Sequence, residues 1–266
     1  MNELLAGSRE WVATVGRIGR FSSEVIRNVW GLRVLRFFGE ALRQAGILIV
    51  GSTLIIWGLV FFTGLGTCGI EGAYFLEAQG APAYAGVFTA LCDLREAVPY
   101  TFGYMMSAKV GTGIVAELGA MRISEEIDAL EVMGFDSMTF LCGTRLLAAW
   151  IVMPFVYITA LGIAYLGSYI AVVLQVGYTT PGGYLLAFWQ FQSPPDMLFS
   201  LIKGMTMVTA IVLVGCYYGY NAGGGPVGVG EATAKAMVLN LVLVTLIGML
   251  GTQIFWGTNP HSPVGG

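Results

Sequence analysis

Four charged residues lie inside stretches that are otherwise apolar, and residues of these types could either bind a polar ligand or hold helices together. Asp93, Arg95 and Glu96 lie in one such stretch, and Lys203 lies in another. A charge inside a membrane-spanning helix is costly unless it is paired or faces water. We weigh two explanations: the cations neutralise carboxylates between helices, or the four residues line a substrate cavity in which Arg95 and Lys203 bind an anionic head group.

A second concentration of charge occupies residues 117–134, which we call the acidic segment. The pattern predicts a short helix of about two to three turns that begins with Ser124 as its cap. Glu125 and Glu126 would then lie in the first turn, where carboxylates suit the positive end of the helix dipole, and Gly134 would end the helix.

The acidic segment also has two chemically different sides. Apolar residues at helical spacing predict one side, namely Ile123, Ile127 and Leu130. Carboxylates three residues apart predict the other, namely Glu125, Asp128 and Glu131. A helix this short is marginal in water by itself, so we interpret the segment as a docking element that something larger holds in place.

Enzymatic chemistry has little support in this sequence. His261 is the one histidine, and neither H-E-x-x-H nor G-x-S-x-G occurs, so we find no nucleophile with a base. The four cysteines are far apart without a C-x-x-C pair, which favours buried thiols over a zinc site or a disulfide framework; they are Cys68, Cys92, Cys142 and Cys216. We therefore predict neither a metal nor a cofactor in this chain.

A glycine-rich stretch at residues 221–231 contains a literal G-x-G-x-x-G at Gly223, Gly225 and Gly228. A dinucleotide-binding fingerprint needs a preceding strand and a βαβ unit, whereas here an apolar stretch precedes it. We interpret residues 221–231 as a tight turn between two spans and expect that the chain itself does not bind ATP.

The composition indicates an all-α integral membrane protein. Of 266 residues, 56% are hydrophobic and 11% are charged, which is too apolar for an ordinary soluble domain. A formal net charge of -3 argues against nucleic acid as a partner, because a chain that binds it usually has a net basic surface. Five apolar stretches are long enough to span a membrane, at about residues 45–65, 83–106, 146–176, 197–220 and 232–256.

An amino-terminal region, residues 1–44, precedes these spans. Between Trp11 and Arg43 the apolar residues keep a helical spacing with arginines interspersed, which predicts an amphipathic helix in the membrane interface. A cytoplasmic helix packed on a partner is the alternative. The first ten residues lack the apolar core and cleavage site of a signal peptide, so we expect the amino terminus to stay in the cytoplasm.

The distribution of cations predicts the orientation of the spans. Seven arginines precede the first span, and Lys109, Arg122, Arg145 and Lys235 lie in or beside alternate loops, whereas residues 66–82, 177–195 and 257–266 have no lysine or arginine. We therefore expect the acidic segment inside and the tail, 257–266, outside. Small residues predict close helix packing at Gly162, Gly167, Gly215 and Gly219, and Pro154 predicts a kink in the long third span.

Three stretches carry a resemblance to a known family. They are residues 116–134 (AELGAMRISEEIDALEVMG), 94–99 (LREAVP) and 216–231 (CYYGYNAGGGPVGVGE). Their residues and their order along the chain resemble those of the MlaE/YrbE permeases. These permeases are membrane subunits of ABC transporters that work with MCE (mammalian cell entry) proteins. The second and third stretches look most similar to the actinobacterial YrbE permeases.

The resemblance implies an interfacial amino-terminal helix, a permease domain over residues 45–256 with five spans, and a coupling helix at about 117–133 between the second and third. It implies a bacterial inner-membrane location, a dimer of identical or related permeases, a lipid cavity lined by Arg95, Glu96 and Lys203, MCE partners, and two copies of a cytoplasmic ATPase that bind ATP and Mg. The coupling residues would be Glu117, Arg122, Glu125, Glu126, Asp128 and Glu131.

Two functions of other classes compete with an ATP-driven lipid permease. An ion-coupled secondary transporter would use Asp93, Glu96 and Lys203 as ion or proton sites, although the spans show no obvious inverted repeat. A non-catalytic membrane scaffold would use the acidic segment to recruit a partner. The sequence leaves open the identity of the lipid, the direction of transport, the second permease and the residues that contact the MCE proteins.

Overall fold

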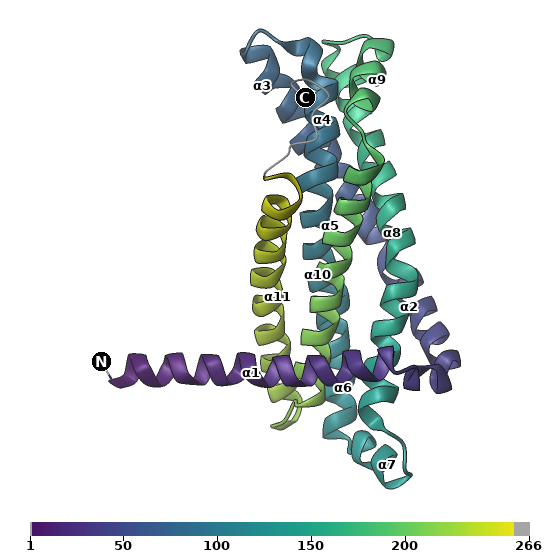
Figure 1. Ribbon diagram of the computed structural model, residues 1–266, viewed down its shortest axis with the longest axis vertical. Coiled ribbons are helices and arrows are strands. Elements are labelled where there is room, and N and C mark those ends of the chain that lie inside the picture. Colours follow the sequence, from purple (N-terminus) through teal and green to yellow (C-terminus); the bar gives the residue numbers. More distant parts are fainter. Residues whose placement is uncertain (1, 258–266) are drawn as a thin grey trace. The chain divides into compact units, whose positions relative to one another are not determined.

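The computed structural model describes the backbone of residues 2–257 and the side chains of residues 13–257. Every regular element in that part of the chain is a helix, which confirms the all-α fold class (Figure 1). Helices follow from the composition, because in lipid only a helix satisfies its own backbone hydrogen bonds within one segment. The tail at 258–266, with His261, lies outside the described residues.

The described helices run in the order that Figure 1 labels. The α-helices are α1 (Asn2–Trp30), α2 (Phe38–Thr63), α3 (Gly72–Ala78), α4 (Ala85–Cys92), α5 (Val98–Met106), α6 (Thr112–Ile123), α7 (Glu126–Val132), α8 (Thr144–Tyr169), α9 (Pro181–Gln190), α10 (Pro194–Tyr220) and α11 (Gly225–Trp256). Two 3-10 helices are η1 (Arg33–Phe37) and η3 (Pro82–Tyr84), and five π-helical segments are η2 (Gly64–Glu71), η4 (Asp93–Ala97), η5 (Ser107–Gly111), η6 (Thr139–Gly143) and η7 (Ile170–Val176).

The chain divides into two compact units. Unit 1 contains Met1–Ile47, Ser107–Ile151 and Thr209–Asn240, and unit 2 contains Leu48–Met106, Val152–Val208 and Leu241–Gly266. The acidic segment therefore belongs to unit 1. The four charged residues of the apolar stretches belong to unit 2.

Four helices of the described chain are long and apolar enough to cross a membrane: Arg33–Ala78, Thr139–Val176, Pro194–Tyr220 and Gly225–Trp256. They overlap four of the five predicted spans. The predicted span at 83–106 is helical through α4, η4 and α5, but it carries the charges of η4 and is not among these four. The count of five spans stays a prediction.

Two stretches that the sequence analysis treats as loops are largely helical. Residues 66–82 continue the helix through η2 and α3, and residues 177–195 contain α9. The start of α9 has a clear local cause: the Thr180 hydroxyl accepts a hydrogen bond from the Gly183 backbone N–H, and Pro181 takes the first helical position. Residues that often form turns, here Thr180 and Pro181, begin a helix, so the prediction of a loop over 177–195 is wrong for α9.

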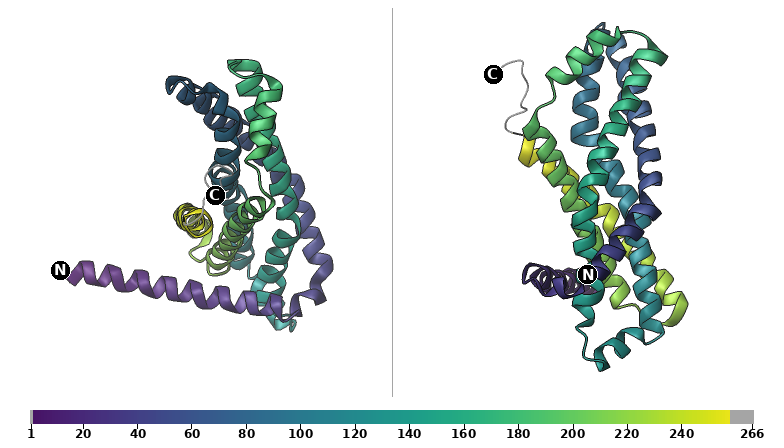
Figure 2. Two further views of the ribbon diagram at one scale, coloured as in Figure 1. Left: turned by 45° about the horizontal axis from the view of Figure 1, so that its top comes forward. Right: turned by 90° about the vertical axis from the view of Figure 1, so that its right-hand side faces the viewer.

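The amino-terminal region is a helix, as expected, but it is not one helix from Trp11 to Arg43. Figure 2 shows α1 as a long uninterrupted helix, which ends at Trp30. Leu32 then adopts a left-handed backbone conformation with φ 58°, and η1 leads into α2, on which Arg43 pairs with Glu40. Within unit 1, α1 buries one side at Phe21, Val25 and Val29, spaced four residues apart, while its arginines from Arg17 onward are exposed.

Small residues allow close packing at three of the four predicted positions. In unit 1, a side chain at Gly215 or Gly219 of α10 would press on the backbone of η5 and α6. In unit 2, a side chain at Gly167 of α8 would meet the Phe61 carbonyl oxygen at 2.6 Å. At Gly162 nothing lies within 4 Å, so the packing prediction there is wrong.

Candidate functional site

The acidic segment folds as two helices rather than one. α6 ends at Ile123, α7 begins at Glu126, and Glu125 between them has a left-handed backbone with φ 62°. The prediction that Ser124 caps the second helix is wrong, because α7 has no side-chain cap and the Ser124 hydroxyl lies 3.0 Å from two acceptors, the Ala120 carbonyl oxygen and the Glu126 carboxylate. The predicted stop is confirmed: α7 ends at Val132, and Gly134 has φ 82°.

Ion pairs and hydrogen bonds within unit 1 hold this bend. Arg122 of α6 pairs with Asp128 of α7 at 2.6 Å, across the break in the helix. Glu117 pairs at 2.8 Å with the buried Arg145 of α8. Two of the predicted coupling residues, Glu117 and Asp128, therefore form ion pairs within unit 1 that stabilise the bend.

Glu131 is held by two hydroxyl groups. Its carboxylate accepts hydrogen bonds from Ser137 at 2.7 Å and from Tyr220 at 3.0 Å. These donors, Ser137 first and Tyr220 second, lower the pKa of Glu131 below its usual value because they stabilise the ionised form. Glu131 thereby ties α7 to α10.

The exposed part of the acidic segment combines charge with apolar surface. Glu125 and Glu126 are exposed, and the neighbouring Val132 and Met133 expose 89% and 63% of their surface. Ile127 alone of the predicted apolar side is fully buried. The exposed apolar residues escaped the sequence analysis because they flank the Gly134 stop, where helical spacing no longer predicts a face.

In unit 2, Lys203 of α10 is fully buried and its ammonium group has three acceptors. They are the Arg95 carbonyl oxygen at 2.8 Å, the Thr252 hydroxyl at 2.7 Å and the Glu96 carboxylate at 3.3 Å. Thr252 also donates to the Glu96 carboxylate at 2.6 Å. The structure thus brings Arg95, Glu96 and Lys203 together, and it adds Thr252 of α11, which sequence analysis missed.

Local backbone chemistry explains why the Arg95 carbonyl is available to Lys203. Pro99 has no backbone N–H, so it can donate neither to the Arg95 carbonyl, four residues earlier, nor to the Leu94 carbonyl, five residues earlier, which is the hydrogen-bond spacing of the π-helical segment η4. The Leu94 carbonyl beside it is likewise taken by a side chain of α10, the Ser200 hydroxyl at 2.5 Å. In lipid such carbonyls must find other donors, so η4 attaches itself to α10.

The side chain of Arg95 has a different partner. Its guanidinium pairs with Asp196 at 3.2 Å and lies over the Trp256 ring at 5.3 Å, and the Trp256 indole N–H donates to Asp196 at 2.8 Å. Asp196 was missed by sequence analysis, although its position in the first turn of α10, after two prolines, was a usable signal.

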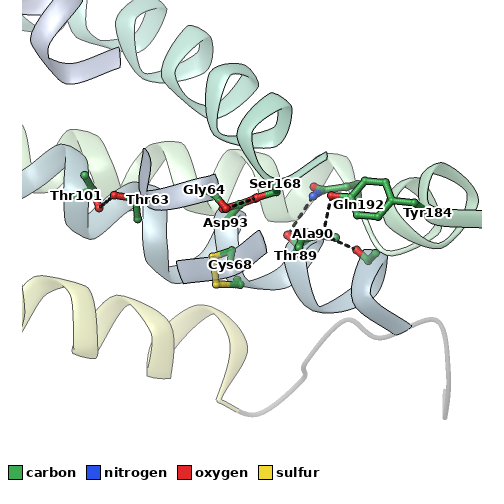
Figure 3. The surroundings of a disulfide bond; sticks show 12 residues. Thr63, Gly64, Cys68, Thr89, Ala90, Asp93, Thr101, Ser168, Tyr184 and Gln192 are labelled. Carbon is green, nitrogen blue, oxygen red and sulfur yellow. Dashed lines mark hydrogen bonds between the residues drawn. A yellow bond between two sulfur atoms is a disulfide. The ribbon is translucent and has the colours of Figure 1, made fainter. Parts of the chain in front are cut away.

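Asp93 is separate from this group, although it shares η4 with Arg95 and Glu96. Its buried carboxylate accepts a hydrogen bond from the Ser168 hydroxyl of α8 at 2.5 Å, and the same hydroxyl lies 2.9 Å from the Gly64 carbonyl oxygen (Figure 3). Asp93 therefore connects η4 to α8 and η2 instead of to the cations.

A disulfide between Cys68 and Cys92 joins η2 to the end of α4, one residue before Asp93 (Figure 3). The prediction of four buried thiols is wrong for this pair, because the helical continuation of η2 brings together two cysteines that are 24 residues apart. It is confirmed for Cys142 and Cys216 of unit 1, which are free and buried. Among the described residues no cluster of histidine, cysteine and carboxylate side chains could hold a metal ion.

The exposed face of α5 beside this site carries two tyrosines. The Lys203 ammonium lies 5.0 Å from the centroid of the Tyr100 ring, and the Tyr104 hydroxyl lies 3.2 Å from the Thr245 hydroxyl of α11. Gly248 of α11 makes room for Tyr100, since a side chain there would collide with the ring. We call the set formed by Glu96 of η4 with Tyr100 and Tyr104 of α5 the α5 polar face.

Comparisons with known proteins match most of the chain to one family. The chain matches the family described as Permease MlaE over residues 41–254. It is 28% identical over 245 residues to a probable ABC transporter permease protein of Rickettsia bellii, covering 91% of this chain and 92% of that one. It is 26% identical over 230 residues to the intermembrane phospholipid transport system permease protein MlaE of Haemophilus influenzae, covering 85% and 86%.

A plant relative is similar over a shorter region. The chloroplastic protein TRIGALACTOSYLDIACYLGLYCEROL 1 of Arabidopsis thaliana is 27% identical over 172 residues, which are 64% of this chain and 49% of that one. The family match covers most of the chain and includes both sites described above. The chain therefore belongs to the MlaE permease family of multi-pass membrane proteins.

Proposed function

We propose that this chain is the permease subunit of an ATP-driven transporter that moves lipids or similar hydrophobic substrates, together with a separate ATPase, a second permease and MCE proteins. The match to the MlaE permease family over residues 41–254 carries the proposal. The similarity to a permease of an intermembrane phospholipid transport system supports a lipid as the substrate class. ATP and Mg would bind to the partner ATPase.

The acidic segment would receive the motion of the ATPase. Its internal ion pairs give α6 and α7 a defined bend, so a push on α7 can be passed to α8 and α10 through Arg145 and Tyr220. The exposed Glu125 and Glu126, with Val132 and Met133 beside them, supply both charge and apolar area for contact. Methionine is enriched at interfaces and exposed apolar area is what a partner can bury, so we assign the main contact to Met133 together with its neighbour Val132.

The orientation proposed from the arginines has support of a different kind. Disulfides persist in oxidising compartments and are rare in the cytoplasm. The Cys68–Cys92 disulfide belongs to the cation-free side of the predicted topology, whereas Cys142 and Cys216 are free and follow the cation-rich acidic segment. Both observations favour a cytoplasmic amino terminus, with Cys68 outside.

The lipid would bind at the group formed by Arg95, Glu96 and Lys203. Asp93 does not join that group through any contact described above, so we omit it from the proposed binding residues. Glu96 is the member with the most exposed side chain, at 43%, and is the residue that a substrate would meet first.

The test is transport by the complete complex in vesicles. We expect lipid movement that requires ATP and stops when the partner ATPase carries an inactivating substitution in its ATP site. Movement that follows an ion gradient without ATP would identify a secondary transporter instead. A complex that assembles but moves no lipid under either condition would identify a scaffold and would contradict the proposal.

A further inference from the structure

In the charged group of unit 2, the cations are largely buried, whereas one carboxylate, that of Glu96, is exposed. The side chains of Lys203 and Asp196 are 0% exposed, that of Arg95 is 13% exposed, and that of Glu96 is 43% exposed. The two cations each have a carboxylate partner, namely Glu96 for Lys203 and Asp196 for Arg95. The charge that reaches the surface is therefore negative.

Hydrogen-bond capacity leads to the same conclusion. An ammonium group has three N–H donors and no acceptor. Lys203 has three acceptors at 2.8, 2.7 and 3.3 Å, so no donor remains for an anionic ligand. A carboxylate has about four lone-pair sites. Glu96 uses one oxygen for Lys203 and the other for Thr252, which leaves acceptor capacity on the exposed side.

Two aromatic rings lie on the same helical face as this carboxylate. Tyr100 and Tyr104 follow Glu96 at intervals of four residues. Tyr104 exposes 37% of its surface. A carboxylate beside the faces of aromatic rings attracts a cation that can also donate hydrogen bonds. It repels a phosphate or carboxylate that has no donor.

We propose that the α5 polar face binds a lipid head group that carries an ammonium group, and that it discriminates against an anionic head group without donors. The inference rests on the proposed lipid-transport function and gives its site a substrate preference. It replaces the expectation from the sequence that Arg95 and Lys203 bind an anion, because both cations have internal acceptors.

The test uses the purified permease complex and three phospholipids with identical acyl chains. Phosphatidylethanolamine carries an ammonium with N–H donors, phosphatidylcholine carries a cation without them, and phosphatidylmethanol is anionic without donors. We expect binding to weaken in that order, with phosphatidylethanolamine favoured over phosphatidylmethanol by about tenfold or more, the effect of one charge-assisted contact. Equal binding, or a preference for phosphatidylmethanol, would overturn the inference and leave the transport function intact.

Variants locate the preference. Glu96→Gln should reduce the ratio between the two lipids to about one, since it removes the negative charge. Because Glu96→Gln also removes the partner of Lys203, a second pair of variants is needed: Tyr104→Leu removes a ring, and Tyr104→Phe keeps it. We expect Tyr104→Leu to lower the ratio several-fold and Tyr104→Phe to keep it. An unchanged ratio in Tyr104→Leu would contradict the proposed face, and binding of no lipid by the wild-type complex would overturn the transport function as well.

Discussion

The acidic segment and the charged group of unit 2 use the same chemistry, arginine or lysine paired with a carboxylate, in opposite surroundings. Arg122 and Asp128 are 36% and 56% exposed, whereas each pair of unit 2 has one member that is 0% exposed, namely Lys203 paired with Glu96 and Asp196 paired with Arg95. An exposed pair contributes about 0–1 kcal/mol, but breaking a buried pair costs about 3–5 kcal/mol, because it leaves a charge unpaired in a poor solvent. The exposed pairs shape a surface that a partner can contact, and the buried pairs hold helices together.

Removing a buried cation should have the largest effect. Lys203→Met leaves the Arg95 carbonyl without this donor and removes the cation paired with Glu96, which keeps the Thr252 hydroxyl, and we expect it to lower stability by about 3–5 kcal/mol. The matched control is Lys235→Met, which breaks the exposed pair with Glu231 and should change stability by less than about 0.5 kcal/mol. Thermal unfolding of the purified protein in detergent measures both. Equal losses in the two variants would contradict the contrast between buried and exposed pairs.

The disulfide should have the next largest effect. Replacing Cys68 and Cys92 together by alanine releases a 24-residue connection in the unfolded chain, so we expect a loss of about 3 kcal/mol. Replacing the free pair, Cys142 and Cys216, by alanine provides the comparison within unit 1. Mass spectrometry of the denatured protein checks the pairing, since alkylation should modify two cysteines without reductant and all four after reduction. Four modified cysteines without reductant would disprove the disulfide.

The exposed apolar residues of the acidic segment should affect association rather than folding. Val132→Asp places a charge in the proposed contact with the ATPase, and we expect affinity to fall by about tenfold or more. Val227→Asp, at a similarly exposed residue near the start of α11, is the control. Co-purification of the ATPase measures the loss while the unfolding temperature stays unchanged. If only Glu125→Lys releases the ATPase and Val132→Asp does not, the carboxylates make the contact instead.

The smallest effect concerns the pH dependence of unit 1. Ser137 and Tyr220 lower the pKa of Glu131 in the folded state relative to the unfolded state. This contribution is therefore present above the unfolded pKa and is lost as the pH falls through the folded pKa. Glu131→Gln should flatten the acid side of a plot of unfolding temperature against pH, below its ordinary value of 4.5. Ser137→Ala should flatten it in part, and an unchanged acid limb in both variants would contradict this role.

Patterns within short stretches of sequence predicted the features that depend on residues close together in the chain. Four of the five predicted spans overlap long apolar helices, Gly134 predicted the end of α7, and Gly215 with Gly219 predicted close packing of α10. Helical continuity was harder to predict, because the π-helical segment η2 carries the helix of α2 beyond the predicted span at 45–65. The reason that α9 was mistaken for a loop is different. The start of α9 depends on one hydroxyl group, that of Thr180, which caps the helix.

The sequence by itself determined the class of protein and the positions of the charges, because an apolar chain must form helices in lipid and a buried charge must find a partner. Only the tertiary structure decided which partners they are. Asp196, Thr252 and Trp256 lie roughly 100–160 residues from η4 along the chain, so no local pattern connects them to Arg95 and Glu96. The pairing of Lys203 with a carbonyl that Pro99 leaves without a donor depends on helix packing, and it decides that the exposed charge at this site is negative.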